Sequence, residues 1–75
     1  MKWRMHYDDQ KGIMIYTGKK KNHYIEILQK DGNANCVLEV TAMSGDHKRE
    51  SYPSLEMAKE SGELYALKGI YKRLL

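Results

Sequence analysis

Apolar and polar positions alternate along the first two thirds of the chain, and short polar clusters interrupt the alternation. A period of two is typical of strands with one buried face, whereas Gly, Asn and Asp in the interruptions are typical of turns. Asp31-Gly32-Asn33 is the clearest hairpin signal, because Gly and Asn tolerate the positive φ that tight turns require. The pattern predicts an antiparallel meander of three to five strands, with candidate strands at 3–7, 13–17, 23–29, 35–43 and 47–52.

The last third of the chain has a helical period instead. Pro53 ends the last strand, and Ser54 is the expected N-cap, since its hydroxyl can accept a hydrogen bond from a backbone N–H one turn later. We expect one long helix over about residues 54–74. Gly62 and Gly69 each weaken a helix by about 1 kcal/mol relative to Ala, and Gly69 is the favoured position if the helix breaks.

This helix carries two apolar stripes on opposite sides. One is rich in small residues and consists of Leu55, Ala58, Gly62, Tyr65, Ala66 and Gly69. The other has heptad-like spacing and consists of Met57, Leu64, Leu67, Tyr71 and Leu74. Small side chains let a helix approach a sheet closely, so we expect the first stripe to face the sheet. We expect the second to be buried against a second copy of the chain or a partner protein; the alternative is that the N-terminal strand or the chain end covers it.

These elements predict an α+β fold, in which an antiparallel β-meander packs against one long C-terminal helix. Residues 1–75 are expected to form a single two-layer domain, with the sheet at about 2–52 and the helix at about 54–74. The sheet residues expected in the core are Trp3, Met5, Ile13, Ile15, Ile25, Ile27, Cys36, Leu38 and Val40.

Composition excludes several classes of protein. The single cysteine, Cys36, cannot form an internal disulfide, and its apolar neighbours predict a buried thiol in a reducing compartment. The sequence has no apolar stretch long enough for a membrane span and no signal-peptide region. We therefore expect a cytoplasmic protein that is not bound to a membrane.

No arrangement of residues predicts an enzyme. His6 with Asp8 and Asp9 is the best candidate for a metal site, but nothing fixes its geometry, and the acids suit a solvated turn. Cys36 lies in an alternating strand, where a thiol is more often part of the core than a nucleophile. We expect no catalytic residue, no metal, no other cofactor and no small-molecule substrate.

Basic residues are concentrated in the predicted sheet. The net charge is +3, and residues 1–35 contain seven lysines and arginines against four acids. The run Lys19-Lys20-Lys21 could grip phosphate at a hairpin tip, or it could be a solvated turn whose lysines discourage edge pairing. Tyr16 and Tyr24 lie close to this run in the sequence, and aromatic residues beside basic ones are typical of single-stranded nucleic-acid binding. The candidate nucleic-acid-binding residues are Arg4, Lys19, Lys20, Lys21 and Lys30.

One part of the sequence resembles known modules. The stretch YIEILQKDGNANCVLEV, the turn MSGD and the stretch YPSLEMAKESGE are similar to the arm-type DNA-binding domains of phage-type tyrosine integrases and, in layout, to plant GCC-box-binding domains. The same stretch resembles the uncharacterised bacterial YegP-like family. The resemblance covers about residues 23–65 and implies a three-stranded sheet that docks in the DNA major groove with the helix behind it. Glu26 and Glu39, on the outward face, depart from the integrase pattern, which has several Arg and Lys there.

Two functional hypotheses follow from these features. The first is a small protein-interaction protein, such as an inhibitor or adaptor of a phage or mobile element, that binds a protein partner or a second copy of itself. The second is a nucleic-acid-binding module that uses the basic hairpin face. The modest net charge and the two acids on the sheet favour the first hypothesis, whereas the fold resemblance and the basic N-terminal half favour the second. Its candidate interface residues are Met14, Tyr16, Tyr24, Leu28 and Val37 on the sheet, and Met57, Leu64, Leu67, Tyr71 and Leu74 on the helix.

Overall fold

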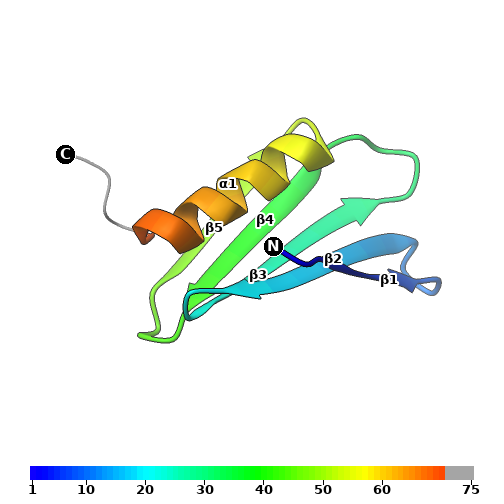
Figure 1. Cartoon of the computed structure of the whole chain (residues 1–75). Helices are drawn as coiled ribbons and strands as arrows, with labels where there is room; N and C mark the ends of the chain where they lie inside the picture. Colours follow the sequence, from blue (N-terminus) through cyan, green and yellow to red (C-terminus); the bar gives the residue numbers. More distant parts are fainter. Residues whose placement is uncertain (71–75) are drawn as a thin grey trace.

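The computed structural model describes residues 1–70 and confirms the α+β architecture (Figure 1). Five strands form one antiparallel sheet in the order β1-β2-β3-β4-β5, so each strand pairs with its neighbours in the sequence. Within the described residues one helix, α1, crosses one face of this sheet, which we call the helix-side face (Figure 1). The elements are β1 (Arg4–Asp8), β2 (Ile13–Lys20), β3 (His23–Lys30), β4 (Cys36–Ala42), β5 (His47–Tyr52) and α1 (Leu55–Lys68).

The hairpin between β2 and β3 is tighter than predicted. Its turn consists of Lys21 and Asn22, whose φ angles are +48° and +64°. Positive φ at both central residues is the geometry of a type I′ turn, which matches the twist of the flanking strands. Because the turn is so short, β2 continues to Lys20. Lys19 and Lys20 are therefore strand residues, and their side chains point to opposite faces of the sheet.

The predicted facing of the β2 side chains was wrong by one position. Tyr16 pairs with Ile27, which is fully buried in the core, and directly paired residues share a face. The even-numbered residues of β2 thus lie on the helix-side face. Apolar side chains occupy both the odd-numbered and the even-numbered positions of β2, so alternation alone could not decide which set faces the helix. The correction places Met14 and Tyr16 on the helix-side face instead of the outer surface, and Ile13 and Ile15 on the outer surface instead of in the core.

The small-residue stripe of α1 faces the sheet, as predicted. Ser54 caps the helix, and its Oγ accepts a hydrogen bond from the backbone N–H of Met57 (3.2 Å). The three small residues Ala58, Gly62 and Ala66 are buried, and α1 packs mainly over β4 and β3. The side chains that are almost wholly buried beneath it are Ile25, Ile27, Cys36, Leu38 and Val40.

The helix ends earlier than predicted. It stops at Lys68 and not near residue 74, because Gly69 adopts a φ of +91°, outside the helical region. The backbone N–H of Gly69 donates to the carbonyl of Tyr65 (2.7 Å), which satisfies one acceptor of the last turn. Ile70 then packs into the core with 3% of its surface exposed. Gly69 is thus the break that the sequence favoured.

Candidate interaction surfaces

The face of the sheet away from α1, which we call the open face, carries a row of apolar side chains. Ile15 pairs with Leu28, and Leu28 pairs with Val37, so the three lie side by side across β2, β3 and β4. Ile13 lies beside this row, and all four side chains are half-buried. Leu28 and Tyr24 thus lie on the outer sheet surface, where the sequence placed them.

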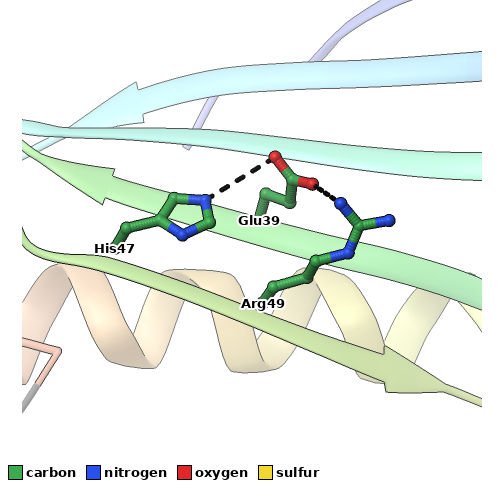
Figure 2. Close-up of polar contacts among 3 residues, drawn as sticks. All are labelled: Glu39, His47 and Arg49. Atoms are coloured by element: carbon green, nitrogen blue, oxygen red, sulfur yellow. Dashed lines mark hydrogen bonds and ion pairs between the residues drawn. The ribbon is translucent and has the colours of Figure 1, made fainter.

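Two glutamates lie in the middle of the open face. Glu39 accepts a hydrogen bond from the guanidinium of Arg49, and its Oε1 lies 3.7 Å from Nε2 of His47 (Figure 2). Glu26 pairs directly with Glu39 across β3 and β4. Like charges at opposite positions destabilise a sheet, and Arg49 offsets this repulsion. The centre of the open face is therefore acidic and partly neutralised.

Basic residues gather where the β2–β3 hairpin turns. We call this cluster the basic end, and it consists of Lys2, Arg4, Lys19, Lys20 and Lys21. Lys2, Arg4 and Lys19 line a surface hollow of about 470 Å³. The three lysines of the hairpin line a second hollow of about 570 Å³. Tyr24 lines both hollows and pairs with Lys19 across the hairpin.

The structure separates one predicted nucleic-acid-binding residue from the others. Lys30 pairs with Ile13, at the opposite end of β3 from the hairpin turn. Of the predicted set, Arg4, Lys19, Lys20 and Lys21 come together, and Lys2 joins them. Lys2 was not among the predicted residues, and it lies before β1 begins at Arg4. Its spacing of two positions from Arg4 is the signal that could have placed both on one face.

The outer side of α1 carries exposed apolar side chains. Met57, Leu64 and Leu67 are 47%, 51% and 52% exposed. They lie opposite the buried stripe, as the heptad-like spacing predicted. The remaining predicted members of this stripe, Tyr71 and Leu74, lie outside the described residues.

A polar cluster that the sequence did not reveal lies at the edge of the helix-side face. The hydroxyls of Tyr52 and Tyr65 both donate to Oε1 of Glu50, at oxygen–oxygen distances of 2.5 Å and 2.7 Å. Lys48 Nζ lies 3.7 Å from the other oxygen. The hydrogen bond from Tyr52 lowers the pKa of Glu50, with further contributions from Tyr65 and Lys48. Alternation in β5 could have placed Glu50 beside Tyr52, but no sequence signal joins either of them to Tyr65.

A second cluster ties the N-terminal segment to the helix. Nζ of Lys59 lies 5.5 Å from the ring centroid of Trp3 and 5.2 Å from that of Tyr16. The indole N–H of Trp3 donates to Glu63 (3.3 Å). Lys59 therefore lies over aromatic rings and not on a fully hydrated side of the helix.

The described residues contain no group of three or more His, Cys, Asp or Glu side chains that could hold a metal ion. Cys36 is buried, and burial raises the pKa of its thiol, which disfavours the reactive thiolate. Across residues 1–70, no helix is long and apolar enough to cross a membrane.

Comparisons with protein-family models, with curated proteins and with solved structures gave no match to this chain. The resemblance to integrase arm domains and to the YegP-like family therefore stays a prediction.

Proposed function

We propose that this protein is a non-enzymatic protein-interaction module that associates with a second copy of itself through the outer side of α1. The observation that carries the proposal is the exposure of Met57, Leu64 and Leu67 on the side of the helix that faces away from the sheet. Large apolar side chains grouped on one helix face are typical of a surface that a partner covers.

The charges beside this stripe support a second copy as the partner. Glu60 and Lys68 are both exposed, and they lie four residues before and four residues after Leu64. In an antiparallel helix pair with its two-fold axis at Leu64, each Lys68 is level with Glu60 of the other copy. In a parallel pair, each of these residues would lie level with the same residue of the other copy, which carries the same charge. The spacing therefore favours an antiparallel pair.

The size of the stripe sets the expected strength of association. A helix of 14 residues is about 21 Å long, so a pair of such helices buries less than the roughly 800 Å² per partner of a standard interface. We expect a weak dimer whose population depends on protein concentration. The role of inhibitor or adaptor expected from the sequence stays a prediction.

Sedimentation velocity over a range of concentrations tests this proposal. The mass of the wild-type protein should rise with concentration, and Leu64→Glu should remain a monomer with the circular dichroism spectrum of the wild type. Met43→Glu is the matched control, because Met43 is 82% exposed but lies in the β4–β5 turn and not on the outer side of α1, so this variant should behave as wild type. A wild-type protein that stays monomeric throughout would refute self-association.

A further inference from the structure

The basic end is a second surface, which the proposed self-association does not use. None of the three ion pairs found among residues 1–70 includes any of its five cations. The residues that line its two hollows include no carboxylate. Five like charges held together without counter-charges raise the local positive potential, which attracts a polyanion.

Tyr24 adds a second kind of contact to this surface. Its side chain is 42% exposed and lies between the two hollows, since it lines both of them. It is held beside Lys19 by the pairing of β2 and β3. An exposed aromatic ring flanked by cations offers stacking to a base and ion pairing to the phosphates on either side of it.

We propose that the basic end binds single-stranded nucleic acid. In this arrangement Lys2, Arg4 and Lys19, which lie on the same face as Tyr24, contact phosphates on one side of the ring, Lys21 in the turn contacts a phosphate on the other, and one base stacks on the Tyr24 ring.

The acids of the open face explain why the ligand is a single strand. A duplex laid across the sheet would bring its phosphates against Glu26 and Glu39, which lie in the middle of that face. A single strand is narrow and flexible enough to follow the basic end alone. Its bases are also free to stack, whereas those of a duplex are already stacked on one another.

Fluorescence anisotropy with a labelled oligothymidylate, measured over a range of salt concentrations, tests the site. Two double variants remove the same charge from exposed positions: Lys19→Ala/Lys21→Ala within the basic end, and Lys11→Ala/Lys30→Ala outside it. Each lost phosphate contact reduces the slope of log K against log salt by about 0.7 for a single strand. We expect the first double variant to lose about 1.4 from the slope and the second to keep the wild-type slope.

Variants of Tyr24 distinguish the contribution of base stacking from that of the positive charges. Tyr24→Ala should bind roughly tenfold more weakly with an unchanged slope, as stacking on one ring predicts, and Tyr24→Phe should bind as the wild type does. An unchanged affinity for Tyr24→Ala would show a general polyanion surface and overturn the proposal.

Three other results would also overturn the proposal. They are no binding to the oligothymidylate at low salt, an equal loss of salt slope in the two double variants, and a duplex that binds as tightly as the single strand. Leu64→Glu should bind the oligonucleotide with the wild-type affinity per chain, so the outcome for this site is independent of the outcome for self-association.

Discussion

Gly62 of α1 lies directly over Ile25 of β3, so close that a Cβ atom at position 62 would be 2.8 Å from Cγ2 of Ile25. The same atom would be 3.2 Å from Cδ1 of Leu38. Glycine in the middle of a helix costs about 1 kcal/mol relative to Ala, and here that cost permits close contact between the helix and the sheet. The packing of the two layers therefore depends on the missing side chain.

Gly62→Leu should lower the free energy of unfolding by about 3 kcal/mol, because the added side chain must displace α1 from the sheet. Urea denaturation at a concentration where the protein is monomeric measures this. Glu56→Leu, at an exposed position in the first turn of the same helix, is the control and should cost less than about 1 kcal/mol. Equal losses in the two variants would contradict the packing described here.

The helix was predictable because its start and its buried face each had a clear signal in the sequence. Ser54 and Pro53 marked the start of α1, and the small residues on one side of the helix identified the buried face. The facing of β2 was not predictable, because Met14 and Ile15 are both apolar and only the pairing with β3 decides which one faces the helix.

The candidate surfaces were predictable only in part. The run of lysines from Lys19 to Lys21 marked the hairpin, but the approach of Lys2 and the separation of Lys30 depend on strand register. The end of α1 was ambiguous for a related reason. A glycine can either continue a helix or end it, and the spacing of the stripe did not indicate that Gly69 would adopt a positive φ or that Ile70 would be buried.

Glu50 should make stability depend on pH. Its pKa is lowered in the folded protein, chiefly by the hydrogen bond from Tyr52, so the unfolded chain takes up the proton at a higher pH than the folded one. The stabilisation is complete above the ordinary pKa of Glu, about 4.3, and is lost as the pH falls through the lowered folded-state pKa.

Glu50→Gln should therefore reduce the free energy of unfolding by about 1–2 kcal/mol at neutral pH, as expected for hydrogen bonds to a charged group. The difference from the wild type should shrink below about pH 4. Urea midpoints measured across this range test the effect, with Asp9→Asn in an exposed turn as the control. A difference that is independent of pH would show that the charge of Glu50 is not involved.

Lys59 should contribute to stability through the rings of Trp3 and Tyr16. Lys59→Ala removes both the cation and the alkyl chain that packs beside the rings, and we expect a loss of about 1 kcal/mol. Lys59→Arg should retain most of the stability, since a guanidinium also binds aromatic faces. The emission of Trp3, the only tryptophan, should shift in Lys59→Ala and not in Lys11→Ala. An unchanged spectrum and midpoint would contradict the contact.

The antiparallel pairing of α1 is tested most directly by reversing the charges on either side of Leu64. Glu60→Lys and Lys68→Glu each place like charges at the same level of the helix pair, so each single variant should dimerise more weakly than the wild type. The double variant Glu60→Lys/Lys68→Glu restores opposite charges across the two-fold axis. The decisive measurement is the dissociation constant of all four proteins by sedimentation equilibrium. We expect the double variant to regain the wild-type dissociation constant, and a double variant as weak as the single ones would show that the helices do not pair in this way.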